Sequence, residues 1–319
     1  MRKFHTFTIR NDRQFIAFTG VSEQIFETLL AEFTRCLHSA RRQKYQKNRK
    51  IRQRRPGGGR RGILATAELK LFFILFYLKN YPTFDVLGGM FDLSASKAKQ
   101  NIKKLLPILK QVEKNLHVLP HRHFHAPANN PKAIPEKEHK IQNIIIDATE
   151  RPHHRPQHAR KQKNYYSGKK HAHTLKNTII SDGDNGIIAV GPTAPGRRHD
   201  YALLKTELDP DQAELSSVDV SVDLGYQGIR DRYPNFHRIN IPHKKPKKSK
   251  SSNPTLTPEQ KKENRAISRV RVGIEHLIGD LKVFQILANK FRNHSISMAD
   301  QVVLAIAGLA NLKNDYVVQ

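Results

Sequence analysis

Residues 140–149 read KIQNIIIDAT, an apolar and β-branched run that closes on an acid. This pattern predicts a buried strand with Asp147 at its end, where an ionised carboxylate is costly unless a cation or a donor meets it. Residues 216–226, SSVDVSVDLGY, alternate strictly between Val and polar residues, and Gly225 closes this second predicted strand beside Asp223. Each acid by itself is more often a turn or cap residue, so a structural and a catalytic role both stay open.

Further strands and helices are predicted around these two runs. Residues 171–192, HAHTLKNTIISDGDNGIIAVGP, predict a hairpin, because an Asp-Gly-Asp-Asn-Gly turn separates two strand-like runs. A polar, basic insert at 242–258 predicts a loop, a long helix is expected at 258–291, and an apolar helix is expected at 297–312. The mixture indicates an α/β domain over residues 141–315, with a mixed sheet flanked by helices.

The long helix carries a third acid. At about 100° per residue, Arg271, Glu275 and Lys282 fall on one stripe of it. The adjoining apolar face is predicted to consist of Val270, Ile274, Leu277, Ile278, Leu281 and Phe284. Arg271 and Glu275 could form an ordinary ion pair one turn apart, but an acid beside two cations also suits a site for a metal and a phosphate.

Three acids on rigid elements suit phosphodiester chemistry. Two divalent metals can activate an attacking oxygen and stabilise a leaving one, and Mg²⁺ prefers carboxylate ligands. Asp147, Asp223 and Glu275 are the candidate acids for such a site.

The charge of the chain points to a polyanionic partner. Its 56 Lys and Arg face 28 Asp and Glu, a formal net charge of +28 with a pI near 10.3, and such an excess is costly in self-repulsion unless a polyanion such as nucleic acid balances it. No membrane role is expected, because the apolar stretch 69–78 is too short to span a bilayer. The first residues lack the pattern of a secretory signal, so a cytoplasmic, nucleoid-associated location is expected. Cys36 is expected to be a buried or incidental thiol.

The first 62 residues are predicted to form a helix and a basic arm. Residues 21–40 repeat Ile25, Leu29, Leu30, Phe33 and Leu37 at helical spacing. Residues 41–61 hold eleven basic residues, no acid and a Pro-Gly-Gly-Gly break. They predict a mobile arm that contacts DNA phosphates, although a solvated linker has the same composition.

Residues 63–120 have the pattern of a helix-turn-helix. Thr66 is expected to cap a helix that stops at Pro82, a short helix follows, and Ser94 is expected to cap a basic helix that ends near Pro107. This third helix would present Ser96, Lys97, Lys99, Gln100 and Lys103 to DNA. A bundle that merely packs has the same periodicity, but the neighbouring basic arm favours DNA recognition.

Residues 121–140 are rich in Pro, His and Asn and predict a linker. Its HRHFH run at 121–125 could chelate a metal, but a flexible, solvated histidine cluster is the preferred interpretation, because nothing nearby fixes a ligand geometry.

Four blocks of the chain resemble bacterial insertion-sequence transposases of the DDE type, of the group numbered five. The first block, DATERPHHRPQHARKQKNYYSGKKHAHTLKN from Asp147, matches an Asp-x-Thr-Glu start and a Tyr-Ser-Gly-Lys-Lys segment, and GRRHDYALL at 196–204 matches a Gly…His-Asp…Leu segment. DLGYQGI from Asp223 resembles the second catalytic block, and Arg271, Glu275 and Lys282 reproduce the spacing of the third. Related transposases have Tyr three positions before this Arg, whereas this chain has Ser268.

The resemblance runs from about residue 64 to about 293 and implies a ribonuclease-H-like fold. It places Asp147 on the first strand, Asp223 on the fourth and Glu275 on a later helix, with a helix-turn-helix module before them. It implies that Asp147, Asp223 and Glu275 are catalytic and bind two Mg²⁺ ions, with Mn²⁺ as a possible substitute. It also implies that Arg271 and Lys282 hold DNA phosphate. Further candidate DNA contacts are Lys169, Lys170, Arg197, Arg198 and the run Lys244–Lys250. Glu150 and Asp200 are expected to support the structure, and Tyr166 either stacks on a base or packs in the core.

These features together predict a DNA transposase. It would bind the terminal inverted repeats of its element as double-stranded DNA, free their 3′-hydroxyl ends by hydrolysis and join them to target DNA. Pairing two ends argues for a homo-oligomer in the active complex. Two alternatives stay open: a transposase-derived DNA-binding protein without catalysis, and a nuclease of the same fold that cuts without strand transfer.

Overall fold

The computed structural model describes residues 2–4, 7–48, 62–124, 141–183, 185–246 and 255–318. Contacts divide the chain into two compact units. The helical unit comprises residues 1–119, 281–289 and 297–317, and the sheet unit comprises residues 120–280, 290–296 and 318–319. This division differs from the predicted domain at 141–315, because the apolar helix near the C-terminus packs in the helical unit.

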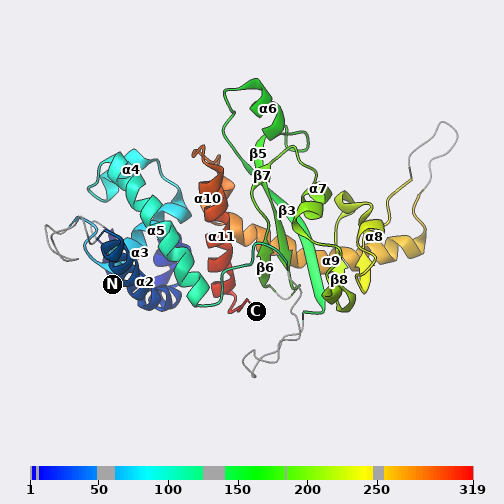
Figure 1. Cartoon of the computed structure of the whole chain (residues 1–319), viewed down its shortest axis with the longest axis horizontal. Helices are drawn as coiled ribbons and strands as arrows, with labels where there is room; N and C mark the ends of the chain where they lie inside the picture. The colour runs from blue at the N-terminus through cyan, green and yellow to red at the C-terminus, as the bar shows by residue number, and fades with distance from the viewer. Residues whose placement is uncertain are drawn as a thin grey trace. The chain divides into compact units, whose positions relative to one another are not determined.

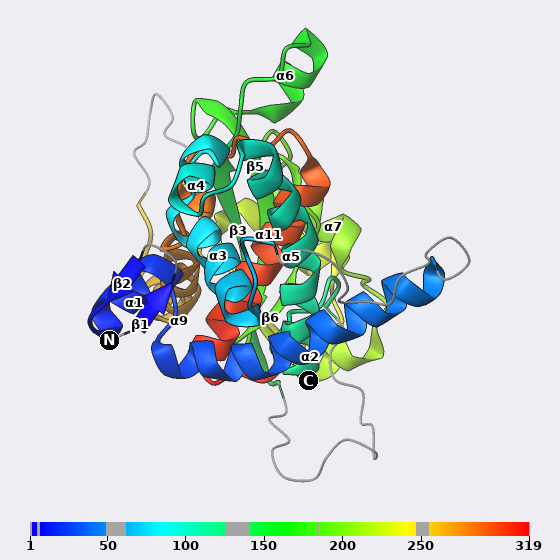
Figure 2. The same cartoon turned by 90° about the vertical axis from the view of Figure 1, so that its left-hand side faces the viewer.

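The helical unit begins with a short hairpin and continues with helices. The hairpin pairs β1 (Arg2–Phe4) with β2 (Phe7–Ile9). The helices are α1 (Asp12–Thr19), α2 (Glu23–Lys47), α3 (Ala67–Asn80), α4 (Phe84–Met90), α5 (Ala95–Asn115), α10 (Gln285–Ala288) and α11 (Ile296–Lys313). Helices α2, α3 and α5 contact one another (Figure 2).

The predicted caps of the helix-turn-helix are confirmed. The side chain of Thr66 accepts a hydrogen bond from the Leu69 amide at 3.0 Å, and Ser94 accepts one from the Lys97 amide at 3.3 Å. Helix α3 ends at Asn80, and its C-cap residue Tyr81 adopts the left-handed conformation directly before Pro82.

Two predicted boundaries are wrong. Helix α5 continues past Pro107 to Asn115, because the missing amide of a proline costs one hydrogen bond while the apolar face goes on beyond it. That face is buried at Ile102, Leu105, Leu106, Leu109 and Val112. Helix α2 likewise extends to Lys47, so the first basic residues of the predicted arm are helical. The rest of that arm, residues 49–61, lies outside the described residues.

Aromatic and aliphatic side chains fill the interior of the helical unit. Every residue from Leu71 to Leu78 on α3 is buried, as expected for a helix surrounded by others. Phe4 stacks on Phe72 with ring centroids 4.2 Å apart, and Cys36 is buried as expected. One described helix, α11, has the length and hydropathy of a membrane span, but 67% of that window is buried inside the protein, which is equally typical of a core helix.

The sheet unit alternates strands and helices. Its strands are β3 (Asn143–Pro152), β4 (Tyr166–Ser167), β5 (Ala172–Ser181), β6 (Ile187–Val190), β7 (Ala194–Pro195), β8 (Asp219–Ser221) and β9 (Arg238–Asn240). Its helices are α6 (Ala159–Tyr165), α7 (Asp200–Glu207), the 3₁₀ turns η1 (Ala213–Ser217) and η2 (Leu224–Tyr226), α8 (Ile229–Arg232) and α9 (Pro258–Lys282), whose last two residues belong to the helical unit.

Strand β3 is the centre of a mixed sheet (Figure 1). It pairs antiparallel with β5 and parallel with β8, and β9 continues the sheet parallel to β8. Strands β5 and β6 pair antiparallel, which confirms the predicted hairpin. Ile144, Ile145 and Ile146 are all buried, so β3 is covered on both faces.

The structure corrects several predictions for this unit. Strand β3 runs five residues beyond Asp147, so this acid lies inside the strand and not at its end. Val270 is 52% exposed and does not belong to the apolar face of α9. His121, expected in a free linker, forms a β-bridge with Ala189, and Phe124 is buried, so the linker begins later than predicted. Residues 125–140 and 247–254 lie outside the described part of the chain.

Candidate active site

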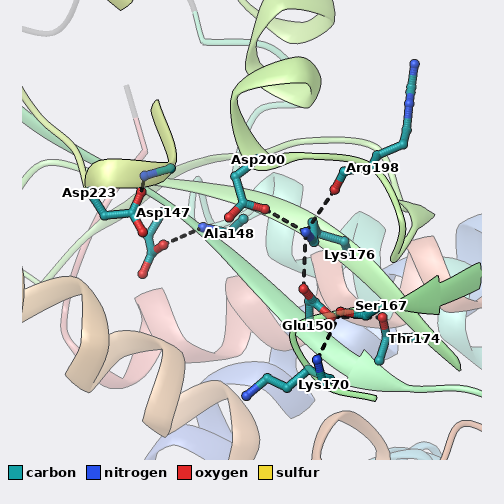
Figure 3. A network of polar contacts seen from close by, with 11 residues as sticks. Asp147, Ala148, Glu150, Ser167, Lys170, Thr174, Lys176, Arg198, Asp200 and Asp223 are labelled. Atoms are coloured by element: carbon teal, nitrogen blue, oxygen red, sulfur yellow. Dashed lines mark hydrogen bonds and ion pairs between the residues drawn. The ribbon is translucent and has the colours of Figure 1, made fainter. Parts of the chain in front are cut away.

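Strand pairing brings Asp147 and Asp223 together. The parallel register of β3 and β8 sets Ile145 opposite Ser221. Asp147 and Asp223 each follow two residues later, and because side chains alternate with a period of two, both acids leave the sheet on the same face. Figure 3 shows the two carboxylates next to each other.

The position of Asp147 makes its charge costly. Burial raises the pKa of Asp147, and the nearby carboxylates of Asp223 and Asp200 raise it further. The Ala148 amide, 2.8 Å from Oδ1, and the guanidinium of Arg271 oppose this effect without cancelling it, so the pKa stays above its ordinary value. An additional cation at this place would therefore lower the free energy of the ionised site.

A tight turn fixes Asp223. Its Oδ1 accepts a hydrogen bond from the Gly225 amide at 2.8 Å, which makes Asp223 the N-cap of η2. A Cβ at Gly225 would lie 2.9 Å from this same oxygen, so a larger residue would displace the carboxylate. Strand β8 ends at Ser221, two residues before the acid, whereas the sequence predicted a strand that reached it.

Arg271 lies between Asp147 and the third predicted acid. Its Nη2 is 3.7 Å from Asp147 Oδ2 and 3.9 Å from Glu275 Oε1. The Glu275 side chain is 59% exposed, compared with 18% for Asp147. Among the described residues, no three His, Cys, Asp or Glu are grouped closely enough to hold a metal ion. The structure thus pairs Asp147 with Asp223 and leaves Glu275 on the outer side of Arg271.

A buried lysine network adjoins the acid pair (Figure 3). Glu150 on β3 and Lys176 on β5 face each other in the antiparallel register. The Lys176 ammonium lies 3.1 Å from Glu150 Oε1 and 2.7 Å from Asp200 Oδ1, and it donates to the Arg198 carbonyl at 2.9 Å. Both side chains of the Glu150–Lys176 pair are 7% exposed, so the network is almost fully withdrawn from water.

Several neighbouring groups stabilise the charges of Glu150 and Lys176. Burial alone would raise the pKa of Glu150, but hydrogen bonds from Thr174 and Ser167 and the charge of Lys176 outweigh it and hold that pKa low. Burial would likewise lower the pKa of Lys176, but the hydrogen bond and charge of Asp200, together with Glu150, raise it. Lys176 is therefore held as an ammonium, and it places the carboxylate of Asp200 beside the acid pair.

Tyr226 lies near the acid pair and Asp200. It follows Asp223 in the turn and is fully buried, and its hydroxyl has no hydrogen-bond partner among the described residues. Burial raises the pKa of Tyr226 well above its ordinary value, and the neighbouring carboxylates of Asp200, Asp147 and Asp223 add to this effect. Its hydroxyl is thus a neutral group beside the acids.

The other predicted site residues lie on exposed surfaces. In the sheet unit Lys169, Lys170, Arg197, Arg198, Lys244 and Lys245 are exposed; in the helical unit Lys97 and Lys99 on α5 and Lys282, the last residue of α9, are exposed. Tyr166 is 43% exposed and meets the His173 ring edge-on, so it does not pack in the core. Ser268 is also exposed.

Sequence reasoning missed the role of Lys176. The signal was a lysine inside the strand-like run HTLKNTIIS, because a charge in a buried strand requires a partner. The identity of the partners could not be read from that run, since Glu150 and Asp200 come from other elements.

Known proteins resemble most of this chain. Residues 146–311 match the family described as DDE superfamily endonuclease, and residues 64–113 match the helix-turn-helix of DDE superfamily endonuclease. A protein from Microchaete diplosiphon, described as a probable transposase for insertion sequence element IS702, is 31% identical over 284 residues, which cover 88% of this chain and 87% of that protein. No solved structure gives a significant match.

Proposed function

The chain belongs to the DDE superfamily of endonucleases and carries the helix-turn-helix of that family, and from this premise we propose that it is a transposase that cuts the DNA ends of its element and joins them to a target. The observation that carries the proposal is the meeting of Asp147 on β3 with Asp223, which follows the neighbouring parallel strand β8, at the place where burial and like charge favour a bound cation.

The sheet supports a ribonuclease-H-like fold for the catalytic part. If the two-residue strands β4 and β7 are set aside, Asp147 lies on the first strand of the sheet unit and Asp223 follows the fourth. Glu275 lies on α9, the helix that comes after the sheet. This order agrees with the placement that the family resemblance implies.

The donor set fits a divalent metal. Asp147 and Asp223 offer carboxylate oxygens, which hard cations such as Mg²⁺ and Mn²⁺ prefer. The region contains four acids and two cations, so negative charge is in excess. The acids are Asp147, Asp223, Asp200 and Glu150, and the cations are Arg271 and Lys176. Two bound metal ions would activate the attacking oxygen and stabilise the leaving oxygen. Asp147 and Asp223 would hold them, and Glu275 would join once its side chain turned inward from the surface.

The protein's own residues position the DNA. Arg271 carries a positive charge beside the acids and can pair with a phosphate oxygen of the scissile strand. Water attacks the phosphorus and the bond to the 3′ oxygen breaks, which leaves a free 3′-hydroxyl on the element. In the second reaction this hydroxyl attacks a phosphodiester of the target, and one bond to phosphorus replaces another.

The helix-turn-helix is the proposed reader of the element's ends. Lys97 and Lys99 are exposed near the N-terminal end of α5, where the second recognition helix of such a motif meets DNA. We expect these ends to be paired by a homo-oligomer in the cytoplasm, where the nucleoid DNA is the target.

The test is cleavage of DNA that carries the element's ends, in the presence of Mg²⁺ or Mn²⁺. Asp147→Ala, Asp223→Ala and Glu275→Ala should each lower the cleavage rate by about 10²-fold or more, a loss of the size seen when one group that stabilises a transition state is removed. DNA binding measured without metal should remain.

The matched control is Asp280→Ala, because Asp280 is an exposed acid on the same helix as Glu275. This variant should cleave DNA at the rate of the unaltered protein. A supplied 3′-hydroxyl donor then tests strand transfer separately. Binding without any cleavage would favour a DNA-binding protein that has lost catalysis, and cleavage without joining would favour a nuclease.

A further inference from the structure

The connection between β3 and β5, residues 153–171, is a projecting segment that we call the finger. The finger has no Asp or Glu but six Lys and Arg. Helix α6 (Ala159–Tyr165) lies within the finger and stands away from the sheet in both views (Figures 1 and 2). The finger is therefore a purely cationic extension of the two strands that carry Asp147 and Lys176.

Helix α6 contributes nothing to the core. None of its residues is buried. Arg160, Lys161 and Lys163 are exposed, and within the described part of the chain they form no ion pair. An exposed short helix without buried residues is marginal in water by itself, and adjacent like charges weaken it further. A polyanion would relieve that repulsion.

The base of the finger, which includes the last two residues of α6, is anchored, whereas the part of α6 with Arg160, Lys161 and Lys163 forms its exposed tip. The His153 ring stacks on Tyr165 with centroids 5.3 Å apart, and the Arg197 amide donates to the Asn164 carbonyl at 3.3 Å. Ser167 pairs with Ala172 of β5 and hydrogen-bonds Glu150 of the buried lysine network. Both ends of the finger are thus fixed to the strands of the acid pair, which limits the entropy lost when the tip binds a ligand.

We propose that α6 binds the sugar-phosphate backbone of the duplex whose scissile bond lies at the acid pair, through Arg160, Lys161 and Lys163. This inference rests on the proposed function and names a contact that the family resemblance did not assign. Lys169 and Lys170, exposed in the turn between β4 and β5, extend the same cationic surface.

The chemistry of α6 favours DNA over other anionic or protein partners. Its sequence ARKQKNY has a single large apolar residue, Tyr165, and that ring is already stacked on His153, so the helix lacks the apolar face that a membrane surface requires. A second copy is disfavoured at α6 for the same reason, because the core of an interface between two copies buries apolar side chains that this helix lacks.

The test uses the full chain with Arg160→Gln, Lys161→Gln and Lys163→Gln combined. Because α6 buries no residue, the melting temperature should not change. Binding to a labelled duplex with the element's ends is measured without divalent metal over a series of salt concentrations. Each lost phosphate contact lowers the slope of log K against log salt by about 0.9, so the slope should fall by about 1 to 3. The affinity should fall equally on an unrelated duplex, since backbone contacts carry no sequence information.

A charge-matched control separates a local contact from the net charge. Lys261→Gln, Lys262→Gln and Arg265→Gln remove three exposed charges from α9 of the same unit, and this variant should keep most of the original slope. Equal slopes in the finger variant and the unaltered protein would overturn the proposal, as would an equal loss in both variants.

A change of oligomeric mass in the finger variant would assign α6 to a second copy instead. A failure of the unaltered protein to cleave would count against the proposed function alone, because this binding measurement needs no catalysis.

Discussion

Two buried glutamates, one in each unit, have opposite surroundings. Glu113 on α5 is completely buried in the helical unit, and neither of its carboxylate oxygens has a hydrogen-bond partner among the described residues. Burial raises its pKa well above the ordinary value, and the charge of Lys110 offsets only part of this effect. Glu150 in the sheet unit is met by Lys176, Thr174 and Ser167, and its pKa is lowered.

The difference follows from what each interior is made of. The helical unit packs aromatic and aliphatic side chains around α3, so an acid inside it meets groups that cannot solvate a charge. The interior of the sheet unit beside β5 instead buries Thr174, Lys176, Asn177 and Thr178. The first interior thus favours the neutral form of its buried acid, and the second favours the ionised form.

Breaking the ion network should have the largest effect on stability. Lys176→Met removes the ammonium and leaves Glu150 and Asp200 buried without their counter-charge, so the free energy of unfolding should fall by about 3–5 kcal/mol. Urea unfolding at neutral pH measures this loss. Lys169→Met, at an exposed position on the same unit, should change the stability by less than about 0.5 kcal/mol. A loss below about 1 kcal/mol at Lys176 would mean that the network does not stabilise the fold.

A substitution on α11 beside Glu113 should have an intermediate effect on the free energy of unfolding. A Cβ at Gly308 would lie 2.9 Å from the Cδ and Oε2 atoms of Glu113, whose side chain is completely buried. Gly308→Ala should therefore destabilise the protein by about 1–3 kcal/mol, although Gly→Ala inside an exposed helix stabilises by about 1 kcal/mol. Gly279→Ala on α9, where nothing lies within 4 Å of the added Cβ, is the control and should not destabilise. The opposite order in thermal unfolding would contradict the packing described here.

The smallest expected effect is a gain in stability for the variant Glu113→Gln, and this gain should depend on pH. Because the folded pKa of Glu113 is raised, its contribution to stability is present below the ordinary glutamate pKa and is lost as the pH rises through the folded value. Glu113→Gln removes this loss, so the free energy of unfolding should hardly change below the ordinary glutamate pKa and should rise by about 1 kcal/mol once the pH exceeds the folded pKa.

Glu150→Gln should show the reverse dependence. The lowered pKa of Glu150 stabilises the fold above the ordinary glutamate pKa, and this stabilisation is lost as the pH falls through the folded value. The substitution should therefore destabilise at neutral pH and lose its effect in acid. Parallel pH profiles of unfolding for the two Gln variants would show that the two interiors do not differ as described.

Much of the fold was predictable because it is encoded locally. The caps at Thr66 and Ser94 depend on one side chain and an amide three residues away, and the hairpin of β5 and β6 depends on its turn. The position of Asp147 within its strand was harder to predict. The apolar run stops at this acid, but the ladder with β5 continues to Pro152, because pairing with a neighbouring strand can hold polar residues in extended structure.

The amino-acid sequence alone determined the cationic character of the chain, the strand that holds Asp147, the strand that precedes Asp223, and the helices of the helix-turn-helix, since charge, periodicity and capping act over a few residues. Only the tertiary structure decided which charges become partners. The β3–β5 register sets Glu150 opposite Lys176, and α11, far along the chain, covers Glu113. Burial and counter-charge depend on contacts between distant segments, and these contacts decide which acids are ionised inside the protein.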